Sequence, residues 1–256
     1  MRRFYAAAIS CLLAFSGCAM AQLNMNSNPD DVLDALHASG QSIKSFSATL
    51  KLNEFDDGTG AETNRFGKVW FQIKADGEPV MHVVFDQKQV NDKKSIPDKV
   101  EYLLDDGWVT NRTDATKTES RMQVVPKGEK MNLFQVGKSP FPMPIGQDRA
   151  EVEKQFDVSK VAPVNDDPPG TIHLLLTPKP NSPLAKQFSS VDLWTDVKTR
   201  MPVRIKTIDS KKAKERTTDL TDLKVNPNLN PQDVSVSKLP PDWRTSDTPL
   251  TEKAEN

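Results

Sequence analysis

Cysteine is scarce in this chain of 256 residues: there are only two, Cys11 and Cys18, and both lie near the amino terminus. The rest of the chain therefore has no thiol for a disulfide or a thiolate metal site, and its stability must come from packing. Glycine is also sparse, with 11 residues against 19 prolines, which favours a β protein with polar turns. Positive charge is not in excess, since 34 Lys and Arg face 35 Asp and Glu. This balance excludes a nucleic-acid binder that relies on a basic patch.

A hydrophobic run long enough to span a bilayer is missing as well, and the mean hydropathy is −0.56. The apolar stretch at residues 6–15, which follows Arg2 and Arg3, is too short for a stable anchor. It predicts a signal peptide over residues 1–21, cleaved to leave Gln22 first in a periplasmic protein. Loss of the two arginines changes the net charge from −1 to −3. Alternatively, the sequence Phe-Ser-Gly-Cys that ends at Cys18 resembles a lipobox, in which acylated Cys18 would anchor the chain to the outer membrane.

One helix is well marked at the start of the exported part. Asn28 can cap it, and Pro29 suits its first turn. Apolar residues then recur at helical spacing, namely Val32, Leu33 and Leu36. Gly40 is expected to end this helix.

From residue 46 apolar and polar residues alternate, which predicts antiparallel strands with one buried face. The expected strands cover residues 46–53, 65–73, 81–85, 100–104, 108–110, 171–177, 190–195, 201–205, 217–225 and 234–238. Asp106-Gly107 predicts a tight hairpin, because this pair tolerates positive φ. Residues 87–99 are expected to form a charged loop and residues 244–256 a disordered polar tail. Between signal peptide and tail, residues 22–243 form one domain.

The middle of the chain departs from this alternation. Three prolines at alternate positions, Pro140, Pro142 and Pro144, exclude a central strand or an ordinary helix. The residues between and after them, Phe141, Met143 and Ile145, are too apolar for a plain surface loop. The pattern predicts a flap packed over something apolar.

Signatures of catalysis are weak. The three histidines, His37, His82 and His173, have no metal-binding spacing, and no G-x-S-x-G motif is present. Residues 235–238 match S-x-x-K by letters alone. Acidic pairs at residues 56–57, 105–106 and 166–167 each precede glycine or proline, where Asp favours turns. We therefore predict no catalytic residue, no metal and no cofactor, and expect a protein that is not an enzyme.

The remaining feature that could indicate a function is the set of apolar residues on the predicted strands. The alternating strands either enclose an ordinary core or form an incomplete barrel whose concave face receives a hydrophobic ligand. Both arrangements require the same alternation, so periodicity leaves the two open.

Several short motifs follow one another in a familiar order. The first three are Ile43-Lys44-Ser45-Phe46-Ser47-Ala48, Gly67-Lys68-Val69-Trp70-Phe71 and Asp106-Gly107-Trp108. Later come Leu174-Leu175-Leu176-Thr177-Pro178-Lys179, the pair of segments 191–194 and 201–205, and residues 218–226. In this order, over about residues 30–243, they resemble the bacterial outer-membrane lipoprotein carriers, the LolA/LolB-like family.

This resemblance implies a mainly β fold with a few helices: an unclosed antiparallel β-barrel covered by a helical lid. It implies a monomeric periplasmic carrier that binds lipoprotein acyl chains, or other lipids, in a cavity and moves them toward the outer membrane. Its partners would be an inner-membrane release complex and an outer-membrane receptor. Two alternatives on the same fold are an outer-membrane receptor anchored through Cys18 and an envelope lipid-sensing regulatory module.

The expected lipid-binding residues are all apolar: Phe71, Ile73, Val83, Phe85, Leu104, Trp108, Phe134, Phe141, Met143, Ile145, Leu174, Leu176, Leu193, Met201 and Val203. Carriers of this family have a basic residue after the second strand that is linked to lid closure. Lys74 stands there in this chain, although without the usual neighbouring proline, and is the expected lid switch.

Overall fold

The computed structural model describes residues 22–126, 129 and 145–250. The predicted signal peptide, Cys18 and the flap residues Phe134, Phe141 and Met143 lie outside the described residues.

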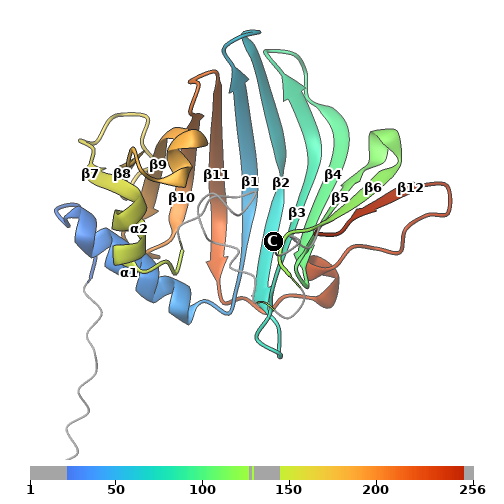
Figure 1. Ribbon diagram of the computed structural model, residues 1–256, viewed down its shortest axis with the longest axis horizontal. Coiled ribbons are helices and arrows are strands. Elements are labelled where there is room, and N and C mark those ends of the chain that lie inside the picture. Colours follow the sequence, from blue (N-terminus) through green and yellow to red (C-terminus); the bar gives the residue numbers. More distant parts are fainter. Residues whose placement is uncertain (1–21, 127–128, 130–144, 251–256) are drawn as a thin grey trace, which may run out of the picture.

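Twelve strands form a single sheet (Figure 1). They are β1 (Ser45–Asp56), β2 (Ala61–Ile73), β3 (Pro79–Val90), β4 (Ile96–Asp105), β5 (Trp108–Thr113), β6 (Thr118–Gln123), β7 (Phe156–Lys160), β8 (Thr171–Pro178), β9 (Phe188–Asp196), β10 (Pro202–Asp209), β11 (Lys214–Val225) and β12 (Arg244–Thr248). Their order across the sheet is β12-β6-β5-β4-β3-β2-β1-β11-β10-β9-β8-β7. The edge strands β12 and β7 do not pair with each other, so the sheet is unclosed, as expected.

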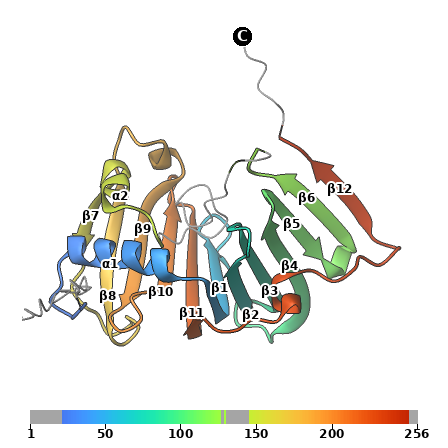
Figure 2. The same cartoon turned by 90° about the horizontal axis from the view of Figure 1, so that it is seen from below.

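Two α-helices cover one half of this sheet. In Figure 2, α1 (Pro29–Ser42) and α2 (Arg149–Gln155) lie over the strands β7–β10. Three short 3₁₀ turns complete the elements: η1 (Asp114–Thr116), η2 (Pro183–Lys186) and η3 (Pro231–Val234). The mainly β fold with a helical cover is therefore confirmed.

The start of α1 follows the prediction, and its end does not. The Asn28 side chain accepts a hydrogen bond from the Asp31 N–H, and the Asp31 carboxylate accepts one from the Asn28 N–H. The helix does not end at Gly40 but continues to Ser42. Gly40 instead lies against the backbone of Gly146.

The hairpin at Asp106-Gly107 is confirmed, since both residues have positive φ (48° and 74°). Residues 87–99 are expected to form a loop, but only residues 91–95 do so. Strand β3 runs on to Val90, and β4 begins at Ile96, with a bulge between Phe85 and Gln87. Backbone pairing requires no apolar side chain, so polar and charged residues extend this hairpin, and Asp98 there pairs with Arg65 of β2 at 2.7 Å.

Two predictions near the carboxyl end were also wrong. Residues 234–238 do not form a strand, because the chain there follows the short turn η3. Residues 244–248 are not disordered but form β12, which pairs with β6 in parallel. The unpaired N–H and C=O groups of a sheet edge accept such a strand whatever its side chains, which here are all exposed.

Candidate functional site: the inner face and its helical cover

One face of the sheet, which we call the inner face, is apolar across its central strands. On this face Phe46 of β1 lies opposite Phe71 of β2, which in turn lies opposite Met81 of β3 and, one strand further, Leu104 of β4. All four side chains are buried. The Phe46 and Phe71 rings stack with their centroids 5.2 Å apart.

The other half of the sheet continues the same surface. Leu174 of β8 pairs with Leu193 of β9, and Leu176 pairs with Val191. All four are fully buried, and Ile205 of β10 lies next to Leu193. The inner face is therefore one continuous apolar surface that both halves of the sheet share.

Helix α1 packs its apolar side onto this surface. Val32, Leu33 and Leu36 are buried in the same cluster of side chains as the strand residues above. Ile145, from the segment before α2, and Val152 of α2 belong to that cluster too. In this structure α1 and α2 thus cover the part of the inner face that β7–β10 form.

A close contact between two backbones holds the end of α1. The Gly146 N–H donates to the Leu36 carbonyl at 3.2 Å, and His37 Nδ1 donates to the Gly146 carbonyl at 3.2 Å. A Cβ on Gly40 would lie 2.2 Å from the Gly146 Cα, so only glycine fits there. Gly146 itself has a φ of 77°, a region that favours glycine.

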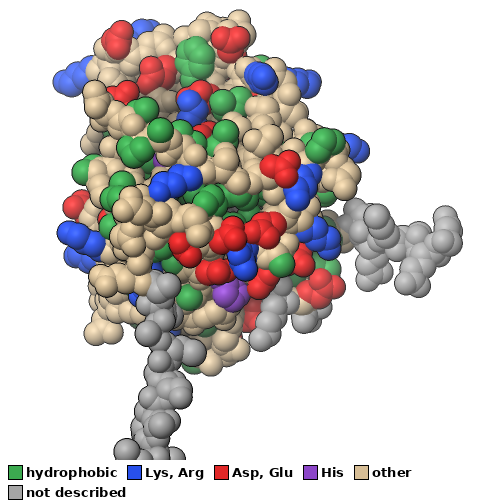
Figure 3. Space-filling model, turned by 90° about the vertical axis from the view of Figure 1, so that its left-hand side faces the viewer, with side chains coloured by type: hydrophobic (Ala, Val, Ile, Leu, Met, Phe, Trp, Pro, Cys, Tyr) green, Lys and Arg blue, Asp and Glu red, His purple; other side chains and the backbone are tan. Residues whose placement is uncertain are grey.

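Ion pairs add a weaker attachment along the exposed side of α1. Arg149 lies 2.8 Å from Asp30 and 3.2 Å from Asp34. The carboxylates are 58% and 61% exposed, so each pair contributes about 0–1 kcal/mol. The side of the molecule that carries β7 and α1 shows acidic and basic side chains among hydrophobic ones (Figure 3).

The structure brings most of the predicted lipid-binding residues together. Those that lie in the buried cluster are Phe71, Val83, Phe85, Leu104, Ile145, Leu174, Leu176, Leu193 and Met201. Their role toward a lipid stays a prediction. Ile73 continues the inner face at the end of β2, where it is 36% exposed. Val203 is the extra residue of a bulge between Pro202 and Arg204 and is only half-buried.

The prediction for Trp108 as part of this surface was wrong. Trp108 pairs with Asp105, whereas the next residues along, Val109 and Leu104, pair on the inner face. Alternation places Trp108 on the outer face, where the Arg121 guanidinium lies 4.9 Å from its ring.

Lys74 does not contact the helical cover. Its Nζ lies 2.8 Å from Asp105 Oδ1 and ties the β2–β3 turn to the β4–β5 turn. The hydrogen bond with Asp105 raises the pKa of Lys74 despite some burial. The basic residue that does reach α1 is Arg149, which the sequence reading missed because the two segments are far apart in the chain.

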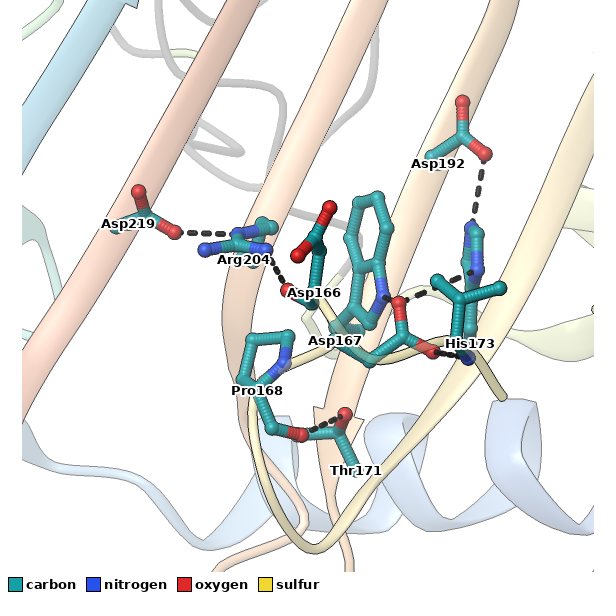
Figure 4. A network of polar contacts seen from close by, with 10 residues as sticks. Asp166, Asp167, Pro168, Thr171, His173, Asp192, Arg204 and Asp219 are labelled. Carbon is teal, nitrogen blue, oxygen red and sulfur yellow. Dashed lines mark hydrogen bonds and ion pairs between the residues drawn. The ribbon is translucent and has the colours of Figure 1, made fainter.

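A polar network lies on the outer face of β8–β10 (Figure 4). His173 stacks on Trp194, with ring centroids 4.0 Å apart, and its Nε2 donates to Asp192 at 2.8 Å. The Trp194 indole donates to Asp167 at 2.6 Å, and Arg204 pairs with Asp219.

Asp167 joins this network to the loop before β8. Its burial alone would raise its pKa, but the Val164 N–H, the Trp194 indole and the charges of His173 and Arg204 outweigh that effect. The pKa of Asp167 therefore lies below its usual range.

A second histidine, His82 of β3, also stacks on a tryptophan of the outer face, in the half of the sheet that ends at β12. His82 stacks on Trp70 and donates from Nδ1 to the Asp233 carbonyl at 2.9 Å. Its Nε2 lies 3.7 Å from Glu101, too far for a hydrogen bond but near enough to interact with its charge. The His82 imidazole, together with Lys99, lowers the pKa of Glu101. His82 thus fastens η3 to the outer face directly. In the other half, Trp194, on which His173 stacks, holds the loop before β8 through Asp167.

The described parts of the chain contain no group of His, Cys, Asp and Glu that could hold a metal ion. Across these same residues no helix has the length and apolar character needed to cross a membrane.

No protein-family model and no curated protein matches this chain. Among solved structures, an uncharacterized conserved protein from Thermus thermophilus is 14% identical, with a TM-score of 0.49; the match covers 85% of this chain and 97% of that one. A LolA superfamily protein from Nitrosomonas europaea is 12% identical, with a TM-score of 0.37, covering 80% and 97% of the two chains. LolA superfamily proteins are thus among the structures similar to this chain. The chain is also similar to a structure in the Pseudomonas aeruginosa MucA/MucB complex, at 15% identity and a TM-score of 0.45. The match covers 81% of this chain and 60% of that one.

Proposed function

We propose that this chain is a non-enzymatic carrier of the bacterial envelope that binds the acyl chains of lipoproteins or other lipids against the inner face of its sheet. The acyl chain replaces α1 on the apolar surface, and α1 returns when the ligand leaves.

The observation that carries this proposal is the nature of the cover. A continuous apolar surface is shielded over one half by a helix that is fastened at one end by a backbone contact and along its side by exposed ion pairs. Exposed ion pairs of this kind contribute little to stability, so the side of α1 that faces Arg149 can separate from it at low cost.

The energies of the two states are comparable. Burial of the three α1 side chains Val32, Leu33 and Leu36 stabilises the closed state by about 5–9 kcal/mol, at about 1.5–3 kcal/mol each. An acyl chain that buries about a dozen CH₂ groups gains about 10 kcal/mol at 0.8 kcal/mol per group. A long acyl chain can therefore displace the helix, and a short one cannot.

A reversible cross-link tests this mechanism. In a chain that starts at Gln22 no cysteine remains, so Asp34→Cys and Arg149→Cys can be joined by a short bis-methanethiosulfonate reagent. It forms a disulfide with each thiol, releases two sulfinates, holds α1 to α2 and is cleaved again by a reductant. Binding of a diazirine-labelled palmitoyl lipopeptide is then measured by photolabelling and mass spectrometry.

We expect adducts on inner-face residues in the free protein, loss of labelling when the link is made, and recovery when it is cleaved. Each single-cysteine variant treated with the same reagent is the control. Adducts confined to the outer face, or equal labelling of the linked protein, would contradict the proposal.

The location of the carrier is tested separately by the intact mass of the chain from its own cell envelope. A chain that begins at Gln22 supports the soluble periplasmic carrier. Acyl groups on Cys18 would instead favour the anchored receptor.

A further inference from the structure

The inner face changes character from one strand to the next toward β12. Three rows run across β3, β4, β5, β6 and β12, as the strand register defines them. The rows are Met81-Leu104-Val109-Met122-Thr248, Val83-Tyr102-Asn111-Ser120-Ser246 and Phe85-Val100-Thr113-Thr118-Arg244. The first two strands are thus apolar apart from the Tyr102 hydroxyl, and the last two carry hydroxyl groups in most positions.

The boundary between the two regions falls on β5, at Asn111. The Oδ1 atom of Asn111 is buried and receives no hydrogen bond. A buried acceptor without a donor is unfavourable, so this atom favours a ligand that brings one. Its neighbours across the strand pairs are Tyr102 on the apolar side and Ser120 on the polar side.

This region has no helix over it among the described elements. Both α1 and α2 lie over the opposite half of the sheet (Figure 2). Ser120 and Ser246 are exposed, and Met122 is 51% exposed. An amphiphile with its polar end over β6 and β12 would have its tail over β3 and β4. Because Met81, Val83 and Leu104 are buried in this structure, that tail would have to enter the apolar cluster there, at a distance from the place of α1.

The charged side chains of β5 and β6 lie on the outer face of the sheet. Arg112 and Glu119 pair with each other on the outer face at 2.6 Å, and Arg121 pairs there with Asp247. On the inner rows of β5, β6 and β12 the single charged residue is Arg244, at the far corner beside Thr118. An ionised head group placed on Asn111 would meet no opposite charge there, and its desolvation would be unfavourable.

We propose that the inner face of β5, β6 and β12 is a head-group subsite for an uncharged, hydroxyl-bearing lipid, with a glycerol hydroxyl donating to Asn111 Oδ1. The subsite selects neutral acylglycerols over anionic lipids with the same acyl chain. This inference rests on the proposed acyl-chain binding and names the chemistry of its polar end.

The test compares three ligands with one acyl chain: 1-monolauroylglycerol, methyl laurate and lauroyl lysophosphatidylglycerol, titrated by calorimetry below their aggregation concentrations. We expect the order of affinity monolauroylglycerol, then methyl laurate, then the anionic lipid. Asn111→Leu should weaken monolauroylglycerol binding by about 3- to 10-fold, the loss of one hydrogen bond, and leave methyl laurate within about twofold.

Two further variants keep the result interpretable if Asn111→Leu folds poorly. Ser120→Ala changes an exposed hydroxyl of the subsite and should weaken monolauroylglycerol binding alone. Thr110→Val, on the outer face of the same strand, should change neither affinity.

The outcomes separate the two proposals. If none of the three ligands binds the unaltered chain, the acyl-binding function itself fails. If all bind equally and the inner-face variants change nothing, acyl binding stands and the head-group subsite is overturned. Tighter binding of lysophosphatidylglycerol would likewise overturn it, since the subsite would then prefer an anion.

Discussion

Gly40 of α1 and Gly146 of the segment before α2 lie backbone against backbone, with room for no side chain on Gly40. The contact joins residues more than a hundred positions apart, and it places the Leu36 carbonyl within reach of the Gly146 N–H. Because neither glycine offers a side chain, the helix is positioned by shape and two hydrogen bonds. This contact fixes where the helix lies, whereas the burial of Val32, Leu33 and Leu36 supplies most of the stability of the closed state.

Replacing this glycine should loosen the helix. In Gly40→Ala the added methyl forces α1 away from Gly146, and overpacking of this kind costs about 1–3 kcal/mol. We expect faster amide hydrogen exchange in residues 29–42 with little change in β1–β3, and tighter binding of the palmitoyl lipopeptide. Gly58→Ala is the control, because its methyl would meet only an Asp56 carboxylate oxygen at 3.3 Å. Unchanged exchange in α1 would contradict the importance of this contact.

Arg149 and Lys74 should behave differently as candidates for holding the cover. Arg149→Ala removes both exposed ion pairs to α1 and should speed amide exchange in α1 up to about fivefold, equivalent to about 1 kcal/mol. The difference from the unaltered chain should vanish near 1 M salt, where charges are screened within about 3 Å. Lys74→Ala breaks only the link to Asp105 and should leave α1 unaffected. An effect of Lys74→Ala on α1 exchange would restore it as the lid switch.

Acid should weaken the outer-face network through Asp167. The pKa of Asp167 is lower in the folded chain than in the unfolded chain, where a carboxyl of this type has a pKa of about 3.9. Its ionised form therefore contributes its full stabilisation above that pH. This stabilisation is lost as the pH falls through the lower pKa of the folded chain. Asp167→Asn should lower the free energy of unfolding at pH 7 by about 1–3 kcal/mol, and this difference should shrink in acid. Asp157→Asn, whose side chain is 73% exposed, is the control in urea titrations across this pH range. A difference that stays constant with pH would argue against the charge of Asp167 as the cause.

The alternation along the chain was enough to predict several buried residues in strands of both halves of the sheet. Leu174, Leu176 and Phe71 had the period of a half-buried strand, and they lie on the inner face. Trp108 shows where the same reasoning fails. Its assignment depended on the register of a short hairpin, and a shift of one residue moves a side chain to the other face.

The partners of charged and polar residues could not be predicted in this way. The Arg149 pairs with Asp30 and Asp34 join segments far apart in the chain, and the strand β12 pairs with an edge formed over a hundred residues earlier. Asn111 looks like any polar strand residue until the strand register places it beside Tyr102 and Ser120.

The sequence by itself determined the helix cap at Asn28, the turn at Asp106-Gly107 and the apolar faces of the strands, because each depends on neighbours within a few residues. Only the tertiary structure decided that the sheet stays open, that α1 lies over one half of it, and that Gly40 meets Gly146. Those features depend on which distant surfaces can approach each other, and local preference contains no information about that.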